Sequence, residues 1–164
     1  MMDLYVIRHA DAKPLGEENI HEDAERPLTE KGHAQSKNIG VKFQKLGIRI
    51  NLVVTSPLLR ARQTAEGLIG GLDKPAPELM TSEELAPGGK RRKLSRFLRD
   101  QANDVIAVVG HMPDLNQYVA WLAGSKKAEV EIDKGGVALV QCPDGPRRSG
   151  GTLKLLVTPS WIEA

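Results

Sequence analysis

The amino-acid sequence predicts an α/β protein: a three-layer α/β/α sandwich with a mainly parallel sheet and a C-terminal antiparallel hairpin. Short apolar runs rich in β-branched residues alternate along the chain with segments of helical periodicity. This alternation is typical of a parallel sheet covered by helices on both faces. The last two apolar runs are joined by residues 143–151, whose prolines and glycines favour turns and leave no crossover helix. We therefore expect these two strands to pair antiparallel.

Five apolar runs are predicted as strands. None of them alternates strictly between apolar and polar residues, so we expect them to be buried on both faces. The runs are residues 4–7, 52–55, 105–109, 137–140 and 153–157. Residues 11–27 and 75–89 are expected to be loops, and the first is long and polar enough to be functional.

Four helices are predicted between these strands. Thr29 is a good N-cap for the first helix, which Gly47 ends, whereas Ser56 and Pro57 offer an N-cap and a first-turn proline for the second. Pro113 opens the fourth helix. Apolar residues recur at helical spacing in each helix: Ala34, Ile39, Phe43 and Leu46; Leu58, Ala61, Ala65, Leu68 and Ile69; Leu94, Phe97 and Leu98; Leu115, Val119, Leu122 and Ala123.

Length and composition favour one domain covering residues 1–164. The net charge of +2 is too near neutral to indicate a nucleic-acid or membrane partner by charge alone. The single cysteine, Cys142, excludes an intramolecular disulfide framework and a cysteine metal cluster. No apolar run is long enough to span a membrane, and the N-terminal residues lack the pattern of a signal peptide, so we expect a cytoplasmic protein.

Cationic and imidazole side chains occur where three predicted strands end. Arg8 and His9 end the first strand, Ser56 follows the second, and His111 ends the run at residues 105–109 after one glycine. Arg60 lies four residues after Ser56, about one helical turn along the chain. Because ligands bind at the carboxyl ends of strands in open α/β sheets, we expect two imidazoles and two guanidiniums to share one pocket.

Such a cluster suits phosphoryl transfer. Guanidinium forks match phosphate oxygens, and imidazoles can add further donors. One neutral imidazole can instead attack phosphorus and form a covalent intermediate. A positive cage stabilises the charge on the transferred group, so we expect a site that works without a metal or another cofactor.

Four segments, in order, resemble the sequence blocks of the histidine phosphatase (phosphoglycerate-mutase-like) superfamily. They are Arg8-His9-Ala10, residues 26–32 (RPLTEKG), residues 56–65 (SPLLRARQTA) and Gly110-His111. The short chain, Ala10 and residues 84–89 (ELAPGG) are similar to the SixA-type phosphohistidine phosphatases, which lack the lid subdomains of the mutases. The resemblance implies a phosphoglycerate-mutase-like fold and an enzyme that removes phosphate from histidine on a protein.

The resemblance also implies roles for individual residues. His9 is expected to be the nucleophile. The phosphoryl oxygens are expected to be held by Arg8, Arg60 and His111. Arg62 matches no position of this cage and is expected to be a surface or loop-pairing residue. Ser56 is expected to cap its helix, with its hydroxyl within reach of the pocket rim.

The general acid is less well defined by these patterns. Many relatives use a carboxylate between the second and fourth blocks to protonate the leaving group, and the candidates here are Glu83 and Glu84. Both residues can equally be solvated side chains before a proline turn. Asp11 and Asp114, each shortly after a block histidine, are alternatives.

Other interpretations stay open. A phosphatase of small phosphate esters in the same superfamily is one alternative. A metal-dependent phosphoesterase, suggested by the close spacing in His9-Ala10-Asp11 and His21-Glu22-Asp23, is another, and a phosphate-binding module without activity is a third. Residues 90–93, with Arg96 and Arg99, form a basic helix face that is either solvated or a docking surface for an acidic phosphoprotein. No set of aromatic side chains lies nearby, which argues against nucleic acid.

Overall fold

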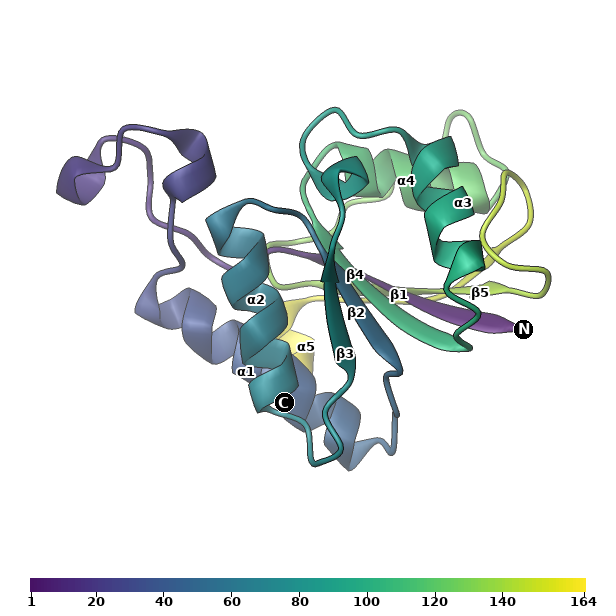
Figure 1. Ribbon diagram of the computed structural model, residues 1–164, viewed down its shortest axis with the longest axis horizontal. Coiled ribbons are helices and arrows are strands. Elements are labelled where there is room, and N and C mark those ends of the chain that lie inside the picture. The colour runs from purple at the N-terminus through teal and green to yellow at the C-terminus, as the bar shows by residue number, and fades with distance from the viewer.

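The computed structural model, which describes residues 1–164, contains one six-stranded sheet between two layers of helices (Figure 1). The strands are β1 (Met2–Arg8), β2 (Leu52–Thr55), β3 (Glu78–Thr81), β4 (Val105–Gly110), β5 (Val137–Cys142) and β6 (Thr152–Val157). Their spatial order is β3-β2-β4-β1-β5-β6. The first four are parallel, and β5 is antiparallel to both of its neighbours. The predicted fold class is confirmed, including the C-terminal hairpin.

The helices lie on both faces of this sheet (Figure 1). One face is covered by α1 (Glu30–Lys45), α2 (Leu59–Gly70) and α5 (Pro159–Glu163), and the other by α3 (Arg91–Asp100) and α4 (Asp114–Leu122). Single turns of 3-10 helix lie in the connections: η1 (Glu17–Asn19), η2 (Asp23–Glu25) and η3 (Glu83–Leu85). The four predicted helices are present, whereas α5 is too short to show a period in the sequence. None of the helices is both long and apolar enough to cross a bilayer.

Alternate side chains of the central strands build two cores. Val6 packs among apolar side chains from α3 and α4, whereas its neighbour Ile7 packs among those from α1 and α2. Both are fully buried, and each such side chain contributes about 1.5–3 kcal/mol. β1, β2 and β4 are therefore buried on both faces, as predicted. Ala123, expected in the stripe of α4, is exposed just beyond the end of that helix.

The two edge strands depart from the predictions. β6 leaves Leu153, Leu155 and Leu156 36–43% exposed, because an edge strand has a neighbour on one side only. β3 lies within residues 75–89, which the sequence predicts to be a loop. Its residues lack a β-branched run, and the strand is defined by backbone pairing with β2, which side-chain patterns do not reveal.

Helix α1 buries a different stripe from the one predicted. Ile39 and Phe43 are buried as expected, but Ala34 and Leu46 are exposed. Gly40 lies in the buried stripe instead, because a Cβ there would come within 2.0 Å of a carbonyl oxygen of α2. Glycine at this position allows the two helices to pack closely.

Helix α2 begins later than predicted. Its N-cap is Leu58, which makes no side-chain cap, so Ser56 is not the N-cap. The Ser56 hydroxyl instead accepts a hydrogen bond from the Leu58 backbone N–H (3.3 Å) and bonds the imidazole of His111 (2.8 Å). The turn from β2 into α2 therefore places a hydroxyl at the carboxyl edge of the sheet.

Candidate active site

The carboxyl ends of β1, β2 and β4 bring the predicted site residues together. Arg8 pairs in register with Gly110, and the backbone N–H of His9 donates to the Gly110 carbonyl (3.0 Å). The backbone N–H of Ser56 donates to the carbonyl of the last valine of β4 (2.9 Å). The ring centroids of His9 and His111 are consequently only 5.2 Å apart.

The second sequence block braces the loop that follows His9. Thr29 donates from its backbone N–H to the Asp11 carbonyl (3.0 Å) and from its hydroxyl to the Asp11 carboxylate (2.8 Å). Gly32 approaches this loop so closely that a Cβ would lie 2.0 Å from the Asp11 carbonyl oxygen. On the other side, the hydroxyl of Thr64 in α2 accepts a hydrogen bond from the N–H of the residue after His9 (3.0 Å). Blocks that are far apart in the chain thus meet around His9.

The hydrogen bonds of His9 define its tautomer. Its Nδ1 lies 2.8 Å from the Ala10 carbonyl oxygen, which can only accept, so Nδ1 carries the hydrogen. The lone pair is then on Nε2, which lies 3.3 Å from Nε of Arg60. Burial, and then the nearby Arg60 and Arg8, lower the pKa of His9 to about 4, although the bond to Ala10 opposes this shift. His9 is therefore neutral at pH 7, and its unprotonated Nε2 accepts a hydrogen bond from the Arg60 guanidinium.

His111 is also held neutral. Burial, and then the charges of Arg60 and His9, lower its pKa to about 3. Its Nε2 bonds the Ser56 hydroxyl, which already accepts from Leu58, so the Ser56 hydrogen is available to His111. In that arrangement the hydrogen of the imidazole is on Nδ1, which is buried and has no partner.

Two arginines complete the site. Arg60 is only 5% exposed, and burial lowers the pKa of both Arg60 and Arg8 without removing their charge. Arg8 donates to the carbonyl of Ile132 (3.1 Å), but its buried Nε has no partner. Only three buried side-chain polar atoms of the chain lack a partner, and two of them are Arg8 Nε and His111 Nδ1. Unpaired buried polar groups require an explanation, and an acceptor oxygen of a bound ligand at each of these two atoms would supply the missing partner.

The sequence analysis missed one residue of this site, Asp23. It lies in η2, and its carbonyl and carboxylate oxygens accept two hydrogen bonds from Arg60, of 2.7 and 3.0 Å. Its other carboxylate oxygen accepts from Arg26 (3.0 Å). Partial burial raises the pKa of Asp23, but the bonds from Arg26 and Arg60 outweigh this effect and the net shift is downward. The sequence analysis noted Asp23 only as a possible metal ligand within His21-Glu22-Asp23, and otherwise only the length and polarity of residues 11–27 pointed to this segment.

We expect Asp23→Asn to strengthen the binding of tungstate or phosphate. An oxyanion must displace the Asp23 carboxylate from Arg60, and the amide competes less well because it carries no charge. The Kd for the oxyanion, measured by calorimetry, should fall about 1.4- to 5-fold, since a partly exposed ion pair contributes ~0.2–1 kcal/mol. Glu22→Gln, at an exposed neighbour, is the matched control. An unchanged or higher Kd for Asp23→Asn would show that the carboxylate does not compete for Arg60.

None of the predicted general acids is hydrogen-bonded to the two histidines. Glu84 accepts a hydrogen bond from the backbone N–H of Lys90 before α3 (2.7 Å). Asp114 accepts one from a loop N–H (3.0 Å), Asp11 is bonded to the N-cap of α1, and Glu83 is exposed. Three of the four carboxylates thus stabilise local backbone or caps, and the choice of a general acid stays a prediction.

Two other residues singled out in the sequence are exposed. Arg62 makes no side-chain hydrogen bond or ion pair, as expected of a surface residue, and His21 is exposed near the tip of the 11–27 segment. No three His, Cys, Asp or Glu side chains are grouped as they would be in a metal site. The single cysteine, Cys142, is buried in the core.

Comparison with known proteins identifies the class. Residues 4–88 match the histidine phosphatase superfamily (branch 1). The chain belongs to this superfamily and is a hydrolase of the histidine phosphatase type.

Two of the similar proteins that match most of this chain are SixA proteins, and a third is uncharacterised. The chain is 31% identical to phosphohistidine phosphatase SixA of Escherichia coli K12, over 82% of this chain and 88% of that protein. A structure of the protein histidine phosphatase SixA complexed with tungstate matches with a TM-score of 0.84 and 26% identity, covering 98% of this chain and 99% of that one. An uncharacterised protein of Picosynechococcus sp. is 34% identical over 98% of this chain and 99% of its own length.

Proposed function

We propose that this protein hydrolyses phosphohistidine on a protein substrate through a phosphohistidine intermediate on His9. The observation that carries the proposal is the unprotonated Nε2 of a neutral, buried His9, whose lone pair is held by a hydrogen bond from Arg60 Nε–H that an incoming phosphoryl group would displace. A protonated imidazole could not attack phosphorus, and the lowered pKa keeps the nucleophile competent at pH 7. The similarity to SixA proteins supports the same activity.

The reaction has two steps. Nε2 of His9 forms a bond to phosphorus while the P–N bond of the substrate breaks, and the leaving imidazole nitrogen takes the electron pair and a proton from solvent water. Water then attacks the phosphorus on His9, which releases inorganic phosphate and restores the neutral imidazole. In both steps Arg8, Arg60 and His111 donate to the equatorial oxygens, and Ser56 orients His111 and adds a hydroxyl at the rim.

The leaving group explains why phosphohistidine suits this site. An alkoxide leaves poorly unless an acid protonates it, whereas a free imidazole has a pKa of about 6.5 and accepts a proton near neutral pH. Glu84, the first candidate acid, has one carboxylate oxygen on the Lys90 N–H and the other 3.8 Å from Lys93 Nζ. A site whose carboxylates are engaged in this way should cleave P–N bonds far better than alkyl phosphate esters.

A protein, rather than a small molecule, suits the surroundings of the site. Residues 75–89 form β3 and η3, so they are not free to build a lid. The segment between Ala12 and Leu28 is closed by a β-bridge at its base and contacts Arg60 through η2. A small metabolite would not be enclosed by so little chain, whereas a side chain presented on another protein needs no enclosure.

A comparison of three substrates at equal concentration tests this proposal. We expect a phosphohistidine peptide to be hydrolysed faster than a phosphoserine peptide or 3-phosphoglycerate. On the phosphohistidine peptide, Glu83→Gln and Glu84→Gln should each lose little activity. Faster turnover of 3-phosphoglycerate, or collapse of either variant on phosphohistidine, would move the protein to the ester-cleaving branch with a carboxylic acid catalyst. Activity that a chelator abolishes and added metal restores would favour the metal-dependent alternative, and binding without any turnover would favour a phosphate-binding module.

A further inference from the structure

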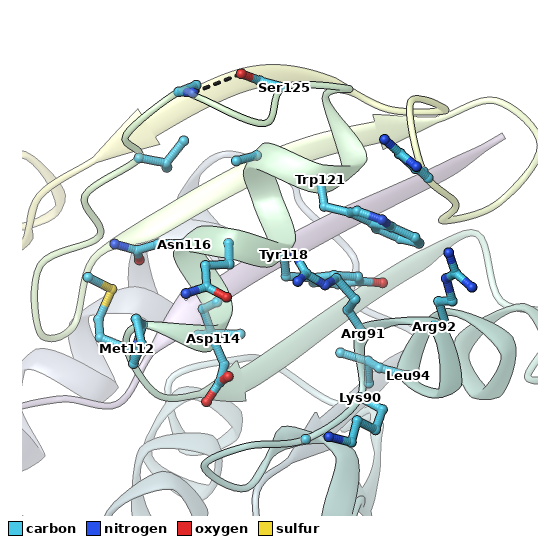
Figure 2. A pocket seen from close by; sticks show the side chains of 18 of the residues that line it. Lys90, Arg91, Arg92, Leu94, Met112, Asp114, Asn116, Tyr118, Trp121 and Ser125 are labelled. Carbon is cyan, nitrogen blue, oxygen red and sulfur yellow. Dashed lines mark hydrogen bonds between the residues drawn. The ribbon is translucent and has the colours of Figure 1, made fainter.

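A groove of about 1400 Å³ lies beside α4, next to the candidate active site (Figure 2). Residues along α4 line it, together with the η3–α3 junction on one side and the connection at residues 124–131 on the other. Met112, which directly follows His111, lines one end of the groove. The groove therefore begins one residue from His111, although neither histidine lines it.

The α3 side of the groove carries an unusual charge pattern. Lys90, Arg91 and Arg92 occupy the N-cap and first two positions of α3, and no acidic residue lies in its first turn. Cations are unfavourable at the positive end of a helix dipole. All three side chains are exposed and line the groove, yet none forms an ion pair within the chain. A negatively charged partner would form ion pairs with these three side chains. Without such a partner, their positive charges destabilise the start of α3.

The floor of the groove is partly apolar. Trp121 is half-buried there and stacks on Tyr118, with ring centroids 6.0 Å apart and the planes tilted by 22°. Half-buried Met112 and Val130 also line the groove. Asn116 Oδ1, the third unpartnered buried polar atom of the chain, belongs to another lining residue. No aromatic set was expected near residues 90–93, but α3 and α4 cover the same face of the sheet, which brings Trp121 and Tyr118 into the groove beside the basic residues. Tryptophan and arginine are enriched among the residues that contribute most to protein–protein binding energy.

We propose that this groove docks an acidic amphipathic helix of the phosphoprotein substrate, with its carboxylates on the α3 side and its apolar stripe on Trp121. The inference rests on the proposed function for the identity of the partner. The opposite wall carries exposed Glu129 and Glu131 beside one cation, Lys126, and its two carboxylates repel the evenly charged backbone of a nucleic acid. A helix can direct its carboxylates to the basic side alone. Recognition of a helix by an apolar groove with a charged margin is a general binding mode.

Docking can be measured without catalysis. The chain has two tryptophans, and the exposed Trp161 lies on α5, on the other face of the sheet. In a Trp161→Phe background, Trp121 reports on the groove alone. The probe is an unphosphorylated helical peptide with one glutamate stripe and one leucine stripe. We expect it to change the Trp121 fluorescence and to bind at least about ten-fold more weakly to K90E/R91E/R92E. That variant should melt at the same or a higher temperature, because the reversed charges suit the helix dipole.

The controls separate docking from total charge. The variant K37E/R49E/K154E changes net charge equally at exposed positions outside the groove, and it should bind the peptide within about two-fold of the parent. Turnover of free phosphohistidine should be unchanged in K90E/R91E/R92E, whereas turnover of a phosphohistidine form of the acidic peptide should fall by the factor seen in binding.

Three results would overturn the proposal. They are absence of binding by the acidic peptide, equal binding of the same peptide with glutamine in place of glutamate, and binding that survives the charge reversal at residues 90–92. Self-association that the reversal abolishes would likewise assign the groove to a second copy of the chain. Because the titration uses an unphosphorylated peptide, it is independent of whether phosphohistidine is hydrolysed, so failure of the proposed function is recognised separately.

Discussion

His9→Ala is expected to abolish turnover while leaving the fold intact. The substitution removes the Nε2 lone pair that faces Arg60, and Nε2 of the second imidazole, His111, is held by the Ser56 hydroxyl. Loss of an attacking group typically costs about 10⁴-fold or more in kcat. Steady-state hydrolysis of a phosphohistidine peptide, with the dye phosphate para-nitrophenyl phosphate beside it, measures the effect.

The matched control is His33→Ala, at an exposed position of α1, which should keep full activity. Folding of His9→Ala is checked by thermal melting as a function of pH. The folded-state pKa of His9 is about 4, below the ordinary value of about 6.5, so the unfolded chain takes up a proton first as pH falls. His9 therefore destabilises the wild type progressively below about pH 6.5, and the variant should lose stability less steeply there. Near-normal turnover by His9→Ala would disprove the assignment of the nucleophile.

Removal of any single cage residue is expected to have the second-largest effect. Arg8→Ala, Arg60→Ala and His111→Ala should each lower kcat by about 10²- to 10³-fold, since one preorganised donor is worth ~2.7–4 kcal/mol in the activation barrier. Arg60→Lys should recover little of this loss, because an ammonium lacks the fork that contacts His9 and an oxyanion together. Arg62→Ala is the control, because Arg62 lies on the same helix and is exposed.

Oxyanion binding tests the same cage without catalysis. Saturating tungstate or vanadate should raise the melting temperature of the wild type, because a ligand that binds only the folded state stabilises it. The shift should shrink in Arg8→Ala and Arg60→Ala and persist in Arg62→Ala. A wild-type melting curve that does not respond to saturating oxyanion would contradict the cage.

Much of the fold follows from local patterns in the sequence, and the exceptions have physical causes. The buried strands were predictable because β1, β2 and β4 need apolar residues on both faces. β3 was missed because an edge strand defined by backbone pairing with one neighbour needs no such pattern. The exposure of β6 was missed for a related reason, since Leu153 and Leu155 read as core residues until the edge position is known.

Some residues of the candidate site could likewise be predicted from the sequence, and others could not. Arg8, His9 and His111 could be predicted to converge because parallel strands end at one edge of a sheet. Asp23 could not, because its contact with Arg60 depends on the path of a long loop rather than on spacing. Ser56 was expected to be a helix cap on the basis of its dipeptide with proline, whereas the real start of α2 leaves its hydroxyl free for His111.

The most direct test of the account is to trap the covalent intermediate. The wild type is mixed rapidly with a radiolabelled phosphohistidine peptide, quenched with alkali during the first turnover, digested and mapped. We expect protein-bound label that is lost in acid and retained in base, located on His9 and absent from His9→Ala. Label on a different residue, or substrate turnover with no protein-bound phosphate in the first turnover, would contradict nucleophilic catalysis by His9.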